Sequence, residues 1–561
     1  MKRTPSMLLI LVLLLVVFSG CKTTGTETTG SVTTTSTATA SSSTTTNPPI
    51  DKLGKYEDTV TVRVINDVAG NELAAGETVD DNRWTRYYKD RLNIEIETIW
   101  TASGDAYIQK YNVMLASGDI PDVFRATSTQ LKQLLDADMV ADLTDVYEEY
   151  MCAEYKSIDD PYMMKAATFD GKIMGIPFSP SMPYVCTVVI WIRSDWLVEL
   201  GLPAPATIDD LEATAKAFME AKLDGQEDTY GIAMNKNSMT DSAFMSIANA
   251  YHAYPGIWVD DGNGGLMNGV IQPGIKDALL KMSEWYEEGV IHKEFGSYGA
   301  GQQNQDLISG KVGIVFDYQW FPFGINDLKS LNPDAEIKAY PIVSADSAPA
   351  KPQSSASITE FFVVNKDFEY PEAIIKMANL WIATVEGAEA YNTAPDGNAN
   401  TVYYGAPADA PGAYEFVDLW FGMIPEQNIY RYYINEAVAK RDPSMVRPVD
   451  LPIYNNIVAY LEGDLKQWAW ERSFGIPNSG SETCRQYKLD GLGMINMFMG
   501  LPTDTMTTCL PMLKQIQAET FMKIVMGEED IDAFDTFVDQ WKDLGGDVIT
   551  EEVNEWYIIN K

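Results

Sequence analysis

Two short runs of alternating aliphatic and polar residues lie close together near the start of the chain. Valine or isoleucine occupies every second position in VTVRV at 60–64 and in IEI at 94–96, a pattern typical of β-strands. Between them, large apolar residues recur at helical spacing over 84–92, after residues of the kind that cap helices. A helix between two strands implies a crossover that makes those strands parallel. The sequence therefore predicts an α/β fold with a parallel sheet.

The alternation continues along the chain. We predict helices over 107–117, 130–143, 207–222 and 273–290, a strand ending near Phe124, and strands over 311–317 and 358–365. Thr207 and Asp210 have the spacing of a capping box at the start of their helix. A chain of 561 residues exceeds what one hydrophobic core usually organises, and no repeat of fixed period is present. We therefore expect two lobes, each built on a doubly wound sheet.

The helix predicted over 273–290 and a last helix, predicted over 530–546 and closed by a glycine C-cap, each carry an apolar stripe at helical spacing, which marks the face that is buried. The stripes are Ile275, Leu279, Met282, Tyr286 and Val290 in the first helix, and Ile531, Phe534, Val538, Trp541 and Leu544 in the second. Trp541 is accordingly expected in the core rather than against a ligand.

The first twenty residues have the layout of an export signal. Lys2 and Arg3 precede an apolar run over 7–18, which is shorter than the roughly 20 residues that span a bilayer. The small residues before Cys21 resemble a bacterial lipobox, in which the cysteine is acylated and the peptide is cut in front of it. Phe18 stands where that motif favours leucine. We expect a signal peptide over 1–20 and a lipid on Cys21.

A tether follows the lipobox. Residues 22–49 are nearly all Thr, Ser, Gly and Ala and end in NPP, a composition with too little apolar surface to offset the entropy of ordering. We expect residues 21–50 to be a disordered link between Cys21 and the folded body.

The charge and the cysteine pattern exclude several kinds of protein. Asp and Glu number 80 against 41 Lys and Arg, a formal charge of −39, so nucleic acid is not an expected partner. The five cysteines, at 21, 152, 186, 484 and 509, show no CxxC spacing, and there are only two histidines. Zinc and thiol-redox motifs are therefore absent. Whether the four cysteines after Cys21 form disulfides stays open.

The common catalytic motifs are also missing. The chain contains no P-loop, HExxH, GxSxG or strand-linked GxGxxG. A glycoside hydrolase needs only two carboxylates at a suitable separation. With so many acidic residues, the sequence singles out no such pair, so a hydrolase stays open as an alternative.

Aromatic residues stand beside polar residues at several predicted loop and strand ends. Sugars present an apolar face and a rim of hydroxyls, so their sites combine aromatic rings with carboxylates and amides. The candidates of this kind are Trp84, Trp100, Trp258, Trp320, Trp420 and Trp468. Trp320 is the strongest, because it follows a predicted strand three residues beyond Asp317, where ligands of open α/β sheets bind.

Several segments in order resemble the family 1 extracellular solute-binding lipoproteins of Gram-positive bacteria, of the LplA-like branch. They are the lipobox and tether, LASGDIPDVF at 115–124, VVIWIRSDWLVELGLPAPATIDDLEATAKAF at 188–218 and KVGIVFDYQW at 311–320. The resemblance covers most of the chain from about residue 56. It implies a periplasmic-binding-type fold (type II) in which two α/β lobes, joined by hinge strands, close over a sugar.

The resemblance also implies how the chain divides between the lobes. Lobe 1 would comprise residues 51–182 and a return over 339–385, starting near Ala339. Lobe 2 would comprise 183–338 and most of 386–561.

The family's site residues transfer to positions of this chain that match its motifs. Its ligand loop after the first strand falls on Asn66 and Asp67. Its N-G-x-W-like stacking motif falls on Asp317, Tyr318 and Trp320, with Asp and Tyr replacing Asn and Gly. A further ligand tryptophan corresponds to Trp258. Arg193 and Trp196 match the family pattern too, and we expect them to be structural.

Some relatives carry an Asp/Asn/Gly-rich calcium loop before a DTYGI-like segment. Here that stretch keeps only Asp224, Glu227 and Asp228, whereas Ca²⁺ takes six to eight oxygens. We therefore expect no metal, and no cofactor is implied.

The leading hypothesis is a non-enzymatic, monomeric receptor that is lipid-anchored on the outer face of the cell membrane. It would capture a sugar and deliver it to the permease subunits of an ABC transporter. The many aromatic residues favour an oligosaccharide, while peptides and modified sugars stay open. A surface sensor or adhesin with the same fold is the third alternative.

Overall fold

The computed structural model describes residues 51–68, 76–156, 163–177, 187–354, 360–385, 432–446, 450–475 and 477–561. Residues 50–561 form one compact unit, separate from residues 1–49. Cys21 and the tether lie outside the described residues. None of the helices built from the described residues is long and apolar enough to cross a membrane.

The described elements pack around two principal cores, which we call lobe 1 and lobe 2. Lobe 1 comprises the described residues of 51–177 and 360–385. Lobe 2 comprises those of 187–354 and 432–561, whose buried residues fall into one large cluster and three smaller ones. Both lobes mix helices and strands, as the sequence predicts.

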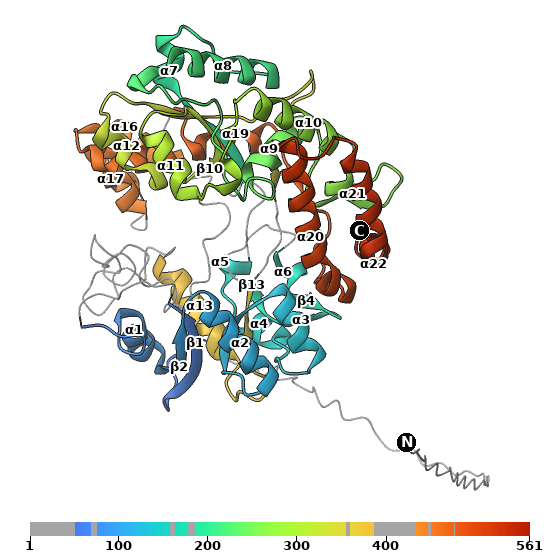
Figure 1. Ribbon diagram of the computed structural model, residues 1–561. Helices are drawn as coiled ribbons and strands as arrows, with labels where there is room; N and C mark the ends of the chain where they lie inside the picture. The colour runs from blue at the N-terminus through green and yellow to red at the C-terminus, as the bar shows by residue number, and fades with distance from the viewer. Residues whose placement is uncertain are drawn as a thin grey trace, which may run out of the picture. The chain divides into compact units, whose positions relative to one another are not determined.

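Lobe 1 contains seven described strands and seven described helices. They are β1 Val60–Asp67, α1 Arg83–Leu92, β2 Ile94–Ala102, α2 Asp105–Ser117, β3 Val123–Thr127, α3 Ser128–Asp136, α4 Thr144–Tyr150, α5 Ala153–Lys156, α6 Met163–Ala166, β4 Thr168–Phe169, β5 Lys172–Ile173, β6 Ile176–Pro177, β13 Glu360–Val364 and α13 Glu372–Val385. Although α13 comes late in the chain, it packs against α1 and α4 (Figure 1).

The first strands pair as predicted. β1 and β2 are parallel, with Val60 opposite Ile94, and the valines at 60, 62 and 64 are buried. The Asp122 N–H donates to the Arg63 carbonyl at 3.0 Å, which joins β3 to β1. β13 is antiparallel to both β3 and β6. The polar ends of β1 and β3 and the start of β13 therefore lie along one edge of the sheet.

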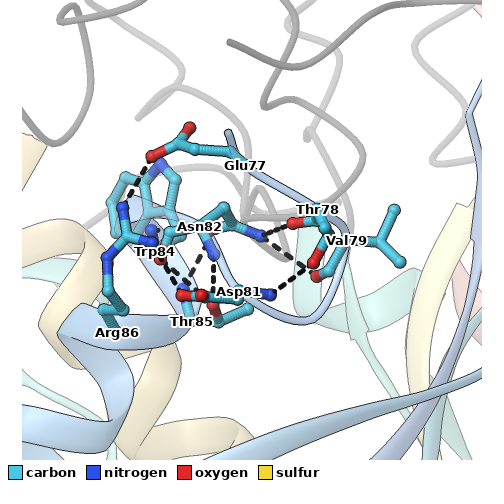
Figure 2. Close-up of polar contacts among 8 residues, drawn as sticks. All are labelled: Glu77, Thr78, Val79, Asp81, Asn82, Trp84, Thr85 and Arg86. Atoms are coloured by element: carbon cyan, nitrogen blue, oxygen red, sulfur yellow. Dashed lines mark hydrogen bonds and ion pairs between the residues drawn. The ribbon is translucent and has the colours of Figure 1, made fainter. Parts of the chain in front are cut away.

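The cap of α1 holds the start of this helix in place (Figure 2). Asn82 is fully buried, and its side-chain oxygen accepts from the Trp84 and Thr85 N–H groups at 2.9 and 3.1 Å. Its amide donates to the carbonyls of Thr78 and Val79, both at 3.0 Å. Asn82 thus satisfies orphan donors of the helix and closes the preceding turn.

Lobe 2 contains the remaining described elements. They are β7 Val188–Arg193, α7 Ser194–Glu199, α8 Ile208–Ala221, α9 Ser242–Ala250, β8 Trp258–Asp260, β9 Leu266–Asn268, α10 Gly274–Glu287, α11 Ala300–Ile308, β10 Ile314–Tyr318, α12 Asp327–Leu331, β11 Ile337–Tyr340, β12 Gln353–Ser354, α16 Tyr432–Lys440, α17 Leu451–Leu461, α18 Trp468–Phe474, α19 Gly480–Leu489, β14 Met494–Ile495, α20 Asp504–Val525, α21 Ala533–Trp541 and α22 Asp547–Asn560. Short 3₁₀ turns join several of them.

The strand that enters each lobe from the other one runs antiparallel to its neighbours. β7 lies between β10 and β11 and is antiparallel to both, as β13 is in lobe 1. The two three-stranded sheets, β10-β7-β11 and β3-β13-β6, are therefore antiparallel, whereas β1 and β2 are parallel. A strand arriving from the other lobe needs no crossover helix.

The return to lobe 1 comes later than the predicted position at Ala339. β11, which contains Ala339, pairs with β7, and Ile342 and Val343 belong to the lobe 2 core. The first described strand back in lobe 1 is β13, which starts at Glu360. The return therefore falls after residue 354.

Three predicted helices differ in detail from the observed ones. The helix predicted over 130–143 ends at Asp136, because the chain turns at Asp138 with φ +54°. In α10 the buried aromatic residue is Trp285, and Tyr286 is only half-buried. The last predicted helix stops at Trp541, a π-turn follows, and Leu544 is exposed.

Candidate functional site

The edge of the lobe 1 sheet brings together the polar ends of several strands. Asn66, at the end of β1, is nearly buried, and its amide donates to the Thr98 hydroxyl at 3.4 Å. Trp100, near the end of β2, packs its ring 5.4 Å from the ring of Tyr107. Arg125 of β3 lies 3.6 Å from Glu360, the first residue of β13. Amide, aromatic and charged groups thus share this edge.

The electrostatics of Tyr107 show that these groups face one another. Burial raises the pKa of Tyr107 to about 12; the positive charge of Arg125 lowers it, and the negative charges of Asp67 and Glu360 raise it further. Asp67, a predicted ligand residue, therefore lies in the field of the same cluster. The edge carries two carboxylates and one guanidinium, and the guanidinium is paired with Glu360.

The end of β10 in lobe 2 forms an exposed aromatic platform. The rings of Tyr318 and Trp320 stack at 5.2 Å with an interplanar angle of 20°, and Trp320 is 41% exposed. We call this pair the Trp320 platform. Such a ring pair, with Trp320 partly exposed, is suited to contact the apolar face of a sugar.

The backbone beneath the Trp320 platform is held rigidly. The indole N–H of Trp191 donates to the Tyr318 carbonyl at 3.0 Å. Gln319, between the two rings, is 2% exposed, and its side-chain oxygen accepts from the Ser481 hydroxyl at 2.9 Å. A Cβ on Gly480 would lie 2.5 Å from the Gln319 Cα. These contacts fix the backbone of the turn that carries the two rings.

A carboxylate lies next to the platform. Asp317 precedes Tyr318, whose N–H donates to it at 2.7 Å. Burial raises the pKa of Asp317 to about 6; the hydrogen bond from Tyr318 lowers it, and the charge of Asp241 adds to the rise. Asp241 caps α9 and was not predicted from the sequence, because nothing in the chain near it marks it out from other acidic N-caps.

A cavity of about 410 Å³ is lined by residues that include Trp258, which is itself only 5% exposed and belongs to the lobe 2 core. Thr127, Ser128 and Glu360 contribute from lobe 1, and Trp258 and Asn496 from lobe 2. The Asn496 side-chain oxygen accepts from the Trp258 N–H at 2.9 Å. Trp541 also lines this cavity, although it is only 3% exposed and packs in the core as predicted.

Two predicted ligand tryptophans are core residues instead. Trp84 and Trp468 are both 0% exposed and belong to the cores of lobe 1 and lobe 2. Both lie in helices, α1 and α18, and for Trp84 the helical spacing of apolar residues over 84–92 already favoured a core position. We exclude these two from the site. Trp420 lies outside the described residues.

The calcium loop of some relatives does not fit a metal here. Asp224 pairs with Arg193 at 2.8 Å, Glu227 with Lys222 at 2.5 Å. Asp228 lies 3.6 Å from Lys311. Each carboxylate that could ligate a cation already has a protein cation beside it. The described residues contain no group of three or more metal-ligating side chains, and we derive no step through a metal.

Two of the cysteines that the structure describes, Cys152 and Cys509, are free thiols. Cys186 lies outside the described residues. Cys484 is buried beside Thr187, so it acts as a small core residue.

Comparison with known proteins identifies relatives of the chain. The family model described as bacterial extracellular solute-binding protein matches residues 69–391. Lipoprotein LipO of Bacillus subtilis (strain 168) is 22% identical over 474 residues, 83% of this chain and 87% of LipO. The polygalacturonan/rhamnogalacturonan-binding protein YtcQ of the same strain is 28% identical over 228 residues, 40% of this chain and 44% of YtcQ.

Solved structures share the fold. A human-milk-oligosaccharide (HMO) binding, ABC-transporter-associated solute-binding protein of Bifidobacterium longum infantis superposes with a TM-score of 0.63, at 18% identity over 89% of this chain and 98% of that chain. The alginate-binding protein AlgQ2, solved without calcium, gives a TM-score of 0.58 at 17% identity over 90% of this chain and 98% of that chain. The predicted two-lobed periplasmic-binding fold is confirmed. With the family model spanning more than half of its residues, the chain belongs to the bacterial extracellular solute-binding protein family.

Proposed function

We propose that this protein is the receptor of an ABC importer and that its ligand is an oligosaccharide. The observation that carries the proposal is the Trp320 platform, in which the exposed ring of Trp320 stacks on the half-buried ring of Tyr318, the residue that follows Asp317. Ring faces take up the apolar face of a pyranose, and carboxylate oxygens accept from its hydroxyls. Asn66, Asp67 and Trp100 of lobe 1 offer the same chemistry on a second edge.

The names of the relatives support a carbohydrate ligand. YtcQ binds polygalacturonan and rhamnogalacturonan, and FusA of Streptococcus pneumoniae is the substrate-binding protein of a fructooligosaccharide ABC transporter. The first of these ligands is an acidic carbohydrate and the second is a neutral one. Trp258, in its cavity of about 410 Å³, is proposed as a further contact.

The test is sugar binding by the mature chain from residue 21, made without its lipid by Cys21→Ser. A ligand that binds the native state raises the unfolding temperature and gives a calorimetric signal. We expect a Trp320→Ala variant to bind at least about tenfold more weakly, and Trp320→Phe to recover part of the loss. Phe323→Ala is the matched control: Phe323 is 40% exposed and packs on Trp470.

Two outcomes would count against this proposal. If no mono- or oligosaccharide raises the unfolding temperature, the claim that the ligand is a sugar is wrong. If Trp320→Ala binds its sugar with normal affinity, the Trp320 platform is not the binding site, although the ligand can still be a sugar.

We further propose that the protein performs no catalysis and acts as a monomer. A lipid-anchored glycoside hydrolase would release reducing ends from the same glycans. A sensor or adhesin would bind them without a transporter, and deletion of the partner permease would then leave its role unchanged. Light scattering of the mature chain measures the mass directly.

The proposed location is the outer face of the cell membrane, with a diacylglyceryl anchor on Cys21. The lipobox-like residues before Cys21 and the Thr/Ser-rich stretch after it support this location. Two acyl chains anchor stably where one binds only marginally. The relative LipO is itself named a lipoprotein.

A further inference from the structure

Two carboxylates lie on β10, which carries Tyr318 of the Trp320 platform, and at the start of α9, which contacts β10. The Ser242 hydroxyl, at the start of α9, donates to the Phe316 carbonyl of β10 at 3.0 Å. The residues next to these two are Asp241 and Asp317. The Asp241 side chain accepts from the Ser242 N–H at 2.7 Å. The Ser242–Phe316 hydrogen bond therefore brings Asp241 close to Asp317, which directly precedes Tyr318 in β10.

No positive charge compensates this pair in the part of the chain that the structure describes. Neither Asp241 nor Asp317 makes an ion pair with a described lysine or arginine, and the polar partner of each is a backbone N–H. Burial, and to a smaller extent the charge of Asp241, raises the pKa of Asp317. At the edge of the lobe 1 sheet, the guanidinium of Arg125 forms an ion pair with Glu360.

We propose that the Trp320 platform selects neutral oligosaccharides and discriminates against sugars that carry carboxylates. This inference rests on the proposed function. Neutral sugars bring hydroxyl donors, which two carboxylates accept. A uronic acid brings a negative charge that the same two carboxylates repel, and repulsion of like charges is an established source of binding specificity. Between the acidic and the neutral carbohydrates named among the relatives, the geometry favours the neutral class.

The experiment compares sugars that differ at C6, where a carboxylate replaces the hydroxymethyl group or a methyl ester replaces the carboxylate. Calorimetry on the mature chain with Cys21→Ser would use maltotetraose, cellotetraose, mannotetraose and β-galactotetraose, each beside its C6-oxidised uronate form. Tetragalacturonate and its methyl ester form a further pair. We expect each bound neutral sugar to bind at least about tenfold more tightly than its uronate partner. The gap should narrow in 0.5 M NaCl, because salt screens the charges.

Three variants assign the effect to the two carboxylates. In Asp317→Asn and in Asp241→Asn, we expect uronates to gain affinity relative to their neutral partners. Asp539→Asn removes an exposed charge on α21 and should leave the gap unchanged. If uronates bind as tightly as neutral sugars, or if the gap persists in both variants, the selectivity is wrong while the sugar receptor stands. If no sugar of either kind binds, the proposed function itself falls.

Discussion

Arg193 holds three segments of lobe 2 together although its side chain is entirely buried. Its guanidinium donates to both carboxylate oxygens of Asp195, at 2.9 and 2.6 Å, and to Asp224 at 2.8 Å. It also lies 4.4 Å over the ring of Trp196. Burial alone would lower the pKa of Arg193, but the two carboxylates raise it. The charge therefore stays on the guanidinium and does locally what a bound cation would do.

Removing this guanidinium should destabilise the protein strongly. We expect Arg193→Ala to lower the free energy of unfolding by about 3 kcal/mol or more, because it leaves Asp195 and Asp224 facing each other without a cation. Since the loop supplies its own cation, we also expect the wild-type unfolding temperature to be the same in CaCl₂ and in EDTA. Differential scanning fluorimetry measures both.

The control for Arg193 is an exposed ion pair. Lys440→Ala breaks a pair with Glu436 whose side chains are both 57% exposed, and such pairs contribute about 0.5 kcal/mol or less. A drop in unfolding temperature on adding EDTA to the wild type would contradict the metal-free interpretation.

For single residues, the sequence predicted which residue types lie at the candidate site better than it predicted which of them are buried. Asp317, Tyr318 and Trp320 were expected together and lie together, because they follow one strand and need only local geometry. Asp241 was missed, since its approach to Asp317 depends on how α9 packs against β10. Trp84 was predicted as a ligand residue, although the helical spacing of its apolar neighbours already favoured a core position.

Among the helices, α8 and α10 are tied together by one carboxylate. Glu212 of α8 accepts from Lys281 at 3.2 Å and from the indole N–H of Trp285 at 3.0 Å, both on α10. It also accepts from Lys216 at 2.6 Å. Burial alone would raise the pKa of Glu212, but these three donors lower it to about 2.

The pH dependence of stability follows from this shift. A carboxyl group whose folded pKa lies below its unfolded value of 4.5 contributes stability above pH 4.5, and loses it as the pH falls towards 2. We expect Glu212→Gln to lower the free energy of unfolding by about 2 to 3 kcal/mol at pH 7. At pH 3 the difference should fall below half of that. Urea unfolding at the two pH values measures it.

The matched control is Glu220→Gln, an exposed glutamate on the same helix, for which we expect a change within about 0.5 kcal/mol at both pH values. A difference between Glu212→Gln and wild type that is equal at pH 3 and pH 7 would rule out the charge as its source.

Elements were predictable where local patterns are strong. β1, β2 and their parallel pairing followed from alternation and crossover length, and the capping box at Thr207 and Asp210 is present. Two of the three failures occurred where a helix ended earlier than its apolar pattern. The last predicted stripe breaks after Trp541, where a π-turn over Lys542–Gly546 contains Gly545 at φ +116° and leaves Leu544 exposed. Periodicity alone cannot distinguish a continuous helix from two helices joined by a π-turn.

For the whole molecule, the sequence predicted two lobes but misplaced one boundary. The two-lobed fold follows from length and from repeated α/β alternation. The point at which the chain returns to lobe 1 depends on whether β11 pairs with β7 in lobe 2 or with a strand of lobe 1. The alternating sequence pattern of β11 is the same in both cases. Long-range pairing of this kind is not encoded in a local window, so the boundary near Ala339 was wrong by more than ten residues.

The anchor on Cys21 is the prediction that belongs to the whole molecule. In a Gram-positive host, we expect the full-length protein to take up a clickable fatty-acid label and to sediment with membranes. Cys21→Ser should lose the label, because the thiol is the acceptor of the diacylglyceryl group. Cys509→Ser, which changes a thiol of the folded body, should keep both properties. Since residues 50–561 form a unit separate from residues 1–49, we expect Cys21→Ser to unfold at the wild-type temperature. A label that persists in Cys21→Ser would place the lipid elsewhere, and an unlabelled wild type would mean that Phe18 prevents processing of the lipobox.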